Sequence, residues 1–111
     1  MIIFNKTINS SKKLNIKKLM SLPAPLTRGK GRVNFEGHTE TWYSQKKLPG
    51  RGLNIPGRHV AGDGTVRDGD GFICVSSDDY SKGTVVNTSL GTGKVYDTGS
   101  GRGNIDIYTN W

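Results

Sequence analysis

The stretch NIDIYTN, at residues 104–110, decides the fold class that this sequence predicts. Its apolar residues Ile105 and Ile107 alternate with Asp106 and Tyr108. Side chains alternate between the two faces of a β-strand, so the pattern predicts a strand with both isoleucines in the core. Asp106 and Tyr108 then share the opposite face.

The segment KVYDT, at residues 94–98, predicts a second strand that ends close to Asp97. A glycine-rich turn of hairpin length separates Asp97 from Asp106, so the hairpin can bring two carboxylates together. A nearby like charge raises the pKa of a carboxyl group, and glycosidic bond cleavage requires a neutral carboxylic acid as proton donor. On the residues alone, an ordinary solvated Asp106 is the competing interpretation.

Three further segments predict strands: HTETWYS at 38–44, FICVS at 72–76 and GTVVNTSL at 83–90. A sixth strand is indicated near residues 58–60. Residues 46–71 contain seven Gly and two Pro, which predicts a long irregular excursion. Short strands at close spacing favour an all-β fold, in the form of a small barrel.

Length and composition exclude several classes of protein. A chain of 111 residues predicts one domain, and 16 glycines disfavour a helical bundle. No apolar run is long enough for a transmembrane segment. The single cysteine, Cys74, cannot form an internal disulfide, and its neighbours Ile73 and Val75 predict a buried thiol.

The formal net charge of +7 comes from one end of the chain. Residues 1–30 contain seven Lys or Arg and no Asp or Glu, which leaves nine basic and nine acidic residues for the remainder. The sequence therefore predicts a basic arm and Pro/Gly linker over 1–32 and a neutral domain over 33–111. Residues 1–20 suit either a disordered arm or a basic amphipathic helix on an anionic surface. A neutral domain argues against nucleic acid as the main partner, and the start contains no recognisable signal peptide.

Other motifs do not support alternative chemistry. Gly91-Thr92-Gly93-Lys94 lacks the first Gly and the metal-binding Ser or Thr of a P-loop. Asp68-Gly69-Asp70-Gly71 lacks the distal Glu of a calcium loop. His38 and His59, in loop-like contexts, form no recognisable metal or nucleophile motif. We therefore predict no metal and no cofactor.

Four segments together resemble the 3D domain, a family named for three aspartates: FICV at 72–75, GTVV at 83–86, GKVYDTG at 93–99 and IDIY at 105–108. TWYS at 41–44 is also similar to the first strand of that family. The family includes the catalytic domain of membrane-bound lytic transglycosylase A. The resemblance, over roughly residues 38–111, implies a small six-stranded double-psi β-barrel, here with a basic N-terminal arm.

The resemblance implies cleavage of the bond between N-acetylmuramic acid and N-acetylglucosamine in peptidoglycan, with a 1,6-anhydro product. Asp106 corresponds to the acid/base of the family and Asp97 to its partner. The side chains expected to contact the glycan strand are Trp42, Tyr43, Asp79, Lys94, Thr98 and Tyr108. Trp42 and Tyr43 point to opposite faces of one strand, so only one of them can face the cleft. A monomer acting at the cell envelope or outside the cell is expected.

The sequence departs from the family at its first aspartate. Ser76 occupies that place, and Asp78 and Asp79 follow two and three residues later. Either one of them substitutes for the missing carboxylate, or the third aspartate is lost. Two alternatives therefore stay open beside the transglycosylase: a non-catalytic glycan-binding barrel of the expansin kind, and a muramidase that hydrolyses the same bond. In each case the basic arm suits anionic wall polymers.

Overall fold

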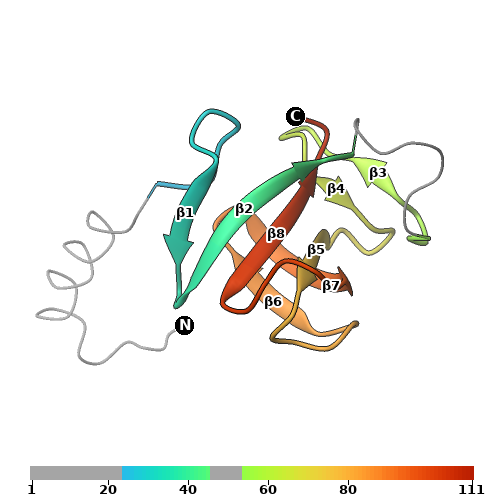
Figure 1. Ribbon diagram of the computed structural model, residues 1–111. Helices are drawn as coiled ribbons and strands as arrows, with labels where there is room; N and C mark the ends of the chain where they lie inside the picture. The colour runs from blue at the N-terminus through green and yellow to red at the C-terminus, as the bar shows by residue number, and fades with distance from the viewer. Residues whose placement is uncertain (1–23, 46–53) are drawn as a thin grey trace, which may run out of the picture.

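The computed structural model describes residues 24–45 and 54–111, which form an all-β fold (Figure 1). Within these ranges the strands are β1 (Arg32–Phe35), β2 (His38–Ser44), β3 (His59–Val60), β4 (Val66–Arg67), β5 (Ile73–Ser77), β6 (Val85–Thr88), β7 (Gly91–Asp97) and β8 (Asn104–Thr109). The predicted basic arm over residues 1–20 lies outside the described residues. In the described part of the chain, no helix has the length and apolar character needed to cross a membrane.

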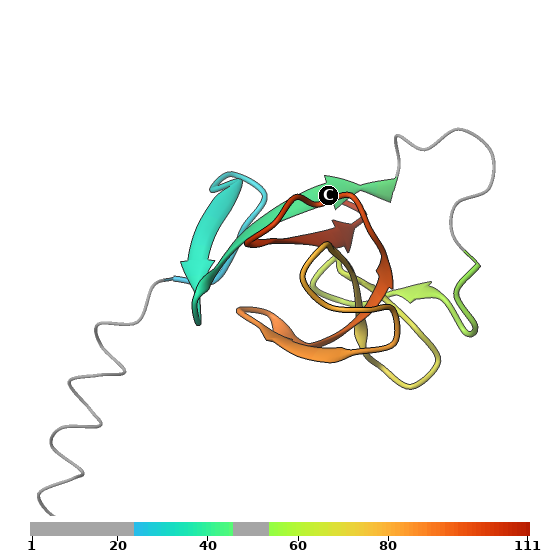
Figure 2. The same cartoon turned by 60° about the horizontal axis from the view of Figure 1, so that its bottom comes forward.

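The last strand lies between two strands from distant parts of the sequence. β8 pairs in parallel with β2 and antiparallel with β5, and β5 pairs in parallel with β7. An antiparallel hairpin joins β6 to β7. Figure 1 shows β2 and β8 side by side, and Figure 2 shows the β6–β7 hairpin (orange) across the body from β2 (green). The four strands β2, β8, β5 and β7 thus form a continuous surface.

The alternation predicted for the last strand is confirmed. Ile105 and Ile107 are buried in the main hydrophobic core, together with Leu26, Val33, Ile73, Val75 and Val95. A second, smaller cluster contains Ile55, Val66, Cys74 and Tyr108. Successive residues of β5 and β8 contribute to different clusters, so the clusters lie on opposite faces of these strands. Asp106 lies on the face of the second cluster.

All six predicted strands are present, and the structure adds β1 and β4. The six-strand count was therefore too low, and residues 54–71, the described part of the predicted excursion, are less irregular than predicted. β4 has only two residues and is held by antiparallel pairs with β3 and β5, so no periodicity reveals it. Leu26 precedes the predicted domain boundary but is 1% exposed and belongs to the core.

The single cysteine is buried, as predicted. Cys74 is 0% exposed, and burial raises the pKa of its thiol to about 12. The thiolate, which is the reactive form, is therefore disfavoured at neutral pH. The residue therefore serves packing in the second hydrophobic cluster.

A close backbone contact at Gly57 gives a prediction for stability. Gly57 has φ of 71°, and a Cβ atom on it would lie 2.4 Å from the Cα atom of Gly69. We expect Gly57→Ala to lower the free energy of unfolding by about 2 kcal/mol, because it combines backbone strain with a clash that no rotamer relieves. Gly62→Ala is the matched control, since nothing lies within 4 Å of its Cβ position. Thermal unfolding followed by circular dichroism measures both, and equal midpoints for the two variants would contradict the prediction.

Candidate functional site

Four polar residues form one row across the continuous surface. Asp106 on β8 pairs with Thr41 on β2 and with Ser76 on β5, and Ser76 pairs with Asp97 on β7. Directly paired residues place their side chains on the same face of a sheet. A β-bulge shifts the β5–β7 register between Val75 and Ser76, and a hydrogen bond from Tyr108, which shares the face of Asp106, places Asp97 on that face. The two predicted carboxylates therefore lie on one face, two strands apart. At about 4.8 Å per strand, their Cα atoms are separated by roughly 10 Å.

Asp106 has few partners for a half-buried carboxyl group. The hydroxyl of Thr41 donates a hydrogen bond of 2.9 Å to its Oδ1 atom. Burial raises the pKa of Asp106 above its usual value, and the bond from Thr41 opposes this shift. The group is therefore better able to keep a proton than an exposed aspartate.

The cause of this pKa shift differs from the expected one. The sequence suggested that the charge of Asp97 would raise the pKa of Asp106, whereas burial is the cause. Asp97 instead accepts a hydrogen bond of 3.1 Å from the Tyr108 hydroxyl and one of 2.9 Å from the backbone N–H of Thr98. These two donors fix the carboxylate of Asp97 at the end of β7, two strands from Asp106.

The aromatic residues divide between the two faces. Trp42 packs against the main core and lies edge-to-face with Trp111, with 5.5 Å between the ring centroids. Tyr43 is 39% exposed and lies beside Tyr108, at 6.1 Å between centroids. Tyr108 shares the face of Asp106, but its ring is only 7% exposed. Tyr43 is therefore the aromatic side chain on this face that a ligand can reach most readily.

The two aspartates after Ser76 hold the turn between β7 and β8. Asp78 accepts hydrogen bonds of 2.7 Å from the backbone N–H groups of Gly99 and Gly101, which lower the pKa of its carboxyl group. Asp79 accepts one of 2.6 Å from the N–H of Gly103, and its Oδ1 atom lies 3.7 Å from Nε of Arg102. Both carboxylates thereby set the path of the chain from Asp97 to Asp106. Ser76, which is 3% exposed, lies between Asp97 and Asp106 in the row, and neither Asp78 nor Asp79 replaces it there.

The remaining predicted contact residues lie around the row. Lys94 pairs with Cys74, so it lies on the same face, and its Nζ atom is 5.3 Å from the ring centroid of Phe72. Thr98 is exposed and follows directly after β7. Neither residue touches Asp106 through a hydrogen bond. Their roles in substrate binding stay predictions, as do those of the other contact residues.

The sequence analysis did not predict the buried carboxylate of Glu40 on β2. Glu40 is 0% exposed and accepts hydrogen bonds from the N–H (2.8 Å) and the hydroxyl (2.6 Å) of Ser89. Nε2 of His38 lies 2.9 Å from the same carboxylate. His38 therefore lies in β2 and is hydrogen-bonded to a buried carboxylate, contrary to its loop-like interpretation. Strand alternation in HTETWYS, which puts Glu40 on the face of Trp42, was the signal that could have found it.

Comparisons with known proteins add no family to this geometry. No family model matches the chain, and neither a curated protein nor a solved structure is found to match it. Among the described residues, no group of three or more His, Cys, Asp and Glu side chains is placed to hold a metal ion.

The bond from Thr41 gives a direct test of the environment of Asp106. Because this bond lowers the pKa of Asp106, we expect Thr41→Val to move the titration midpoint of the Asp106 carboxyl to higher pH. The carboxyl carbon can be followed by ¹³C NMR. Thr39→Val is the matched control, since Thr39 lies on the same strand and donates to Asn34 instead. A midpoint that stays in place or falls in Thr41→Val would contradict this account of the site.

Proposed function

We propose that this protein is a peptidoglycan lytic transglycosylase built on a double-psi β-barrel. The support for the barrel is its strand pairing: two parallel pairs, β2–β8 and β5–β7, are joined through the antiparallel pair β5–β8. The support for the activity is one observation, the half-buried carboxyl of Asp106 in a row of polar side chains. A carboxyl group whose pKa is raised by burial is suited to protonate a glycosidic oxygen.

The reaction needs one proton donor that later accepts a proton. In the proposed first step, the carboxylic acid of Asp106 gives its proton to the glycosidic oxygen while the bond from that oxygen to the anomeric carbon breaks. In the second, the C6 hydroxyl of the same muramyl residue bonds to the anomeric carbon and returns its proton to Asp106. Asp106 ends as it began, and no water is consumed. One residue in both roles is ordinary general acid–base catalysis.

Asp97 supports this reaction through charge. Positive charge develops at the sugar ring as the glycosidic bond breaks, and a carboxylate on the same face lowers the energy of that state. The donors Tyr108 and Thr98 hold Asp97 in one orientation. Burial and the adjacent charge of Asp97 raise the pKa of Tyr108, so its hydroxyl stays a donor. Tyr43 offers an exposed ring against which a sugar can pack.

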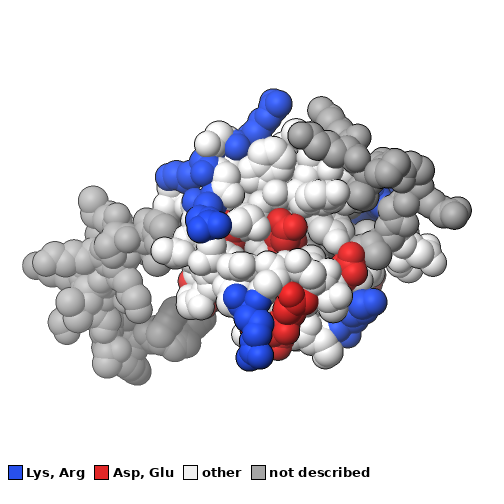
Figure 3. Space-filling model, viewed as in Figure 1, with Lys and Arg blue, Asp and Glu red and all other residues white. Residues whose placement is uncertain are grey.

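The proposed partners are glycan strands and anionic wall polymers. Arg28 and Lys30 are exposed just before β1, and Arg32 is exposed at its start, so the described part of the chain also carries positive charge at this end. On the face seen in Figure 3, some Lys and Arg side chains gather along the upper edge, while lower on the face Lys and Arg lie beside Asp and Glu. That face offers no continuous basic track of the kind a nucleic acid requires. Action at the cell envelope or outside the cell is part of the proposal.

Product analysis tests the proposed reaction. Purified peptidoglycan is incubated with the full chain, and the soluble fragments are identified by mass spectrometry. A transglycosylase releases anhydro-muramyl ends, whereas a muramidase releases ends heavier by one water molecule. Anhydro ends are the expected result. Hydrated ends would replace the proposal by hydrolysis.

A second candidate function follows from Ser76. The place between the two carboxylates holds a hydroxyl, and Asp78 and Asp79 are bound to backbone N–H groups of the neighbouring turn. A site with only two carboxylates in its row can bind a glycan without cleaving it. This binding module predicts that the protein sediments with insoluble peptidoglycan while no soluble fragment is released.

A further inference from the structure

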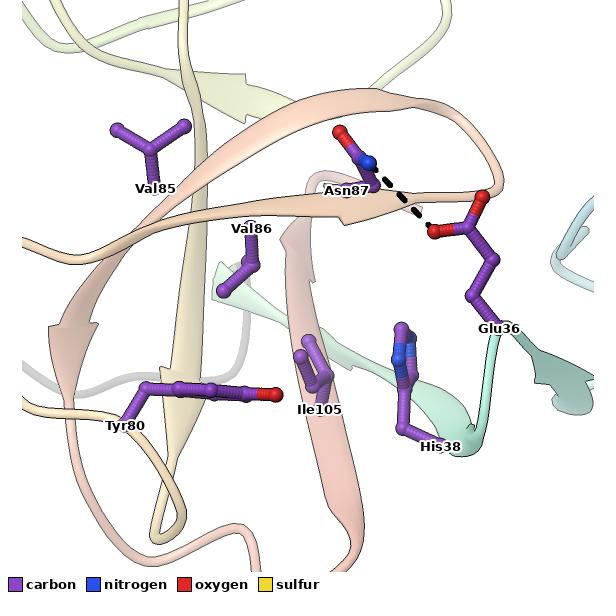
Figure 4. A pocket seen from close by; sticks show the side chains of 7 residues that line it. All are labelled: Glu36, His38, Tyr80, Val85, Val86, Asn87 and Ile105. Atoms are coloured by element: carbon purple, nitrogen blue, oxygen red, sulfur yellow. Dashed lines mark hydrogen bonds between the residues drawn. The ribbon is translucent and has the colours of Figure 1, made fainter.

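A pocket of about 220 Å³ lies on the face of β8 that is opposite to Asp106. It is lined by Glu36, His38, Tyr80, Val85, Val86, Asn87 and Ile105 (Figure 4). Ile105 belongs to the main core, so the pocket opens where that core reaches the surface. Pockets for drug-sized ligands start at about 300 Å³. This one is suited to a smaller group, such as a single side chain.

The walls of the pocket are apolar and aromatic. Figure 4 shows Val86 above the ring of Tyr80, whose hydroxyl points toward Ile105. Tyr80 is 52% exposed and Val85 51%, so two of the four exposed large hydrophobic residues among the described ones line this pocket. Such surface favours a ligand with an aliphatic part.

The charge of the pocket lining is negative, although the chain as a whole is strongly basic. Glu36 is its carboxylate, and no Lys or Arg lines it. Directly behind His38 lies the buried carboxylate of Glu40. The amide of Asn87 reaches Glu36 over 3.5 Å, so that carboxylate keeps most of its capacity to accept hydrogen bonds. The lining therefore attracts a cation and repels an anion.

The backbone of Glu36 is an independent sign that this carboxylate has a role. Glu36 is the one non-glycine residue with positive φ (45°) in the described chain, and Gly37 follows with φ of 84°. A two-residue hairpin turn of this kind prefers Asn or Asp in its first position. A glutamate there is less favourable for the turn itself. Locally unfavourable backbone is concentrated at functional sites.

We propose that this pocket binds a primary alkylammonium group, such as a lysine side chain of a peptide. The aliphatic chain packs between Val86, Ile105 and the ring of Tyr80, and the ammonium group binds the carboxylate of Glu36. A sugar is a poorer fit, because its hydroxyls need several free polar partners, while His38 is already bound to Glu40 and much of the remaining lining is apolar. The site is separate from Asp106 and does not rest on the proposed function.

The test uses pentylammonium chloride as the probe and the full chain as the protein. Methyl signals of Val85, Val86 and Ile105 are followed in ¹H–¹³C NMR spectra during titration. We expect saturable shifts with a dissociation constant of roughly 1–10 mM, as befits a ligand of six heavy atoms. The binding should weaken with added salt. Pentan-1-ol, which has the same aliphatic chain without the charge, should bind at least tenfold more weakly.

Glu36→Asn separates binding from folding. Asparagine suits this turn better than glutamate, so the variant should unfold at the same or a higher temperature, yet bind pentylammonium at least tenfold more weakly. Asp70→Asn removes an exposed carboxylate from the β4–β5 turn and should leave the binding unchanged. Equal binding by wild type and Glu36→Asn would overturn the proposal. So would pentan-1-ol or N-acetylglucosamine shifting the same methyl signals as strongly as pentylammonium.

Discussion

Replacing Asp106 with Asn is expected to reduce the rate of fragment release from peptidoglycan by about 10²- to 10⁴-fold, the usual contribution of a general acid–base residue. Asparagine has the same shape and can still accept the hydrogen bond from Thr41. The variant should therefore fold and sediment with peptidoglycan like the wild type. Release of dye-labelled fragments measures the rate, with Asp70→Asn as the control for loss of one carboxylate.

The same substitution should raise thermal stability at neutral pH. The pKa of Asp106 is raised in the folded state, so the folded state favours the protonated form. The stabilisation this provides is present below the unfolded pKa and is lost as pH rises through the folded pKa. At pH 7 the variant should melt a few degrees above the wild type, and the difference should shrink as the pH is lowered. An active variant, or one that melts below the wild type at pH 7, would contradict the role given to Asp106.

Glu40→Ala is expected to destabilise the fold by about 3 kcal/mol. The change removes the acceptor of three groups: the backbone N–H and the hydroxyl of Ser89, and Nε2 of His38. Each unsatisfied buried donor costs about 1–3 kcal/mol, and the missing side chain leaves a cavity. For a domain of this size the melting temperature should fall by roughly 12–24 °C.

A double-mutant cycle with Ser89→Ala checks the origin of that loss. If the Glu40–Ser89 hydrogen bonds cause the loss in free energy of unfolding, the loss in the double variant should be much smaller than the sum of the losses in the two single variants. Glu40→Gln, which keeps the volume and one acceptor, should cost less than Glu40→Ala. A loss below 1 kcal/mol for Glu40→Ala, measured by urea unfolding, would show that this carboxylate does not hold β2 to the β6–β7 hairpin.

The sequence predicts correctly which side chains of β8 face the core, but it does not predict which strands pair with β8. Alternation is a local property, so Ile105 and Ile107 could be assigned to the core from seven residues. The partner of Asp106 could not, because Thr41 is 65 residues away and reaches it through a parallel pairing that leaves no local pattern. For the same reason the sequence attributed the raised pKa of Asp106 to Asp97, although burial causes it.

The missed elements share a physical cause. β4 has only two residues and is stabilised by pairing with β3 and β5, so propensity within the glycine-rich segment does not reveal it. Glu40 is a charged residue at a core position, and its burial is favourable because His38 and the distant Ser89, 49 residues later, bind its carboxylate. Glycine-rich composition predicted the turn between β7 and β8, but it wrongly placed Gly91 and Gly93 in a turn, since both lie in β7. It gave no information on which strands the turns would bring together.

The most direct test of the central claim compares wild type and Asp106→Asn on the same purified peptidoglycan, with the soluble fragments identified by mass spectrometry. The account predicts anhydro-muramyl fragments from the wild type and none above background from the variant, with both proteins bound to the insoluble wall. Equal fragment release by the two proteins, or no fragments from a wild type that binds the wall, would contradict the claim that Asp106 is the acid of a lytic transglycosylase.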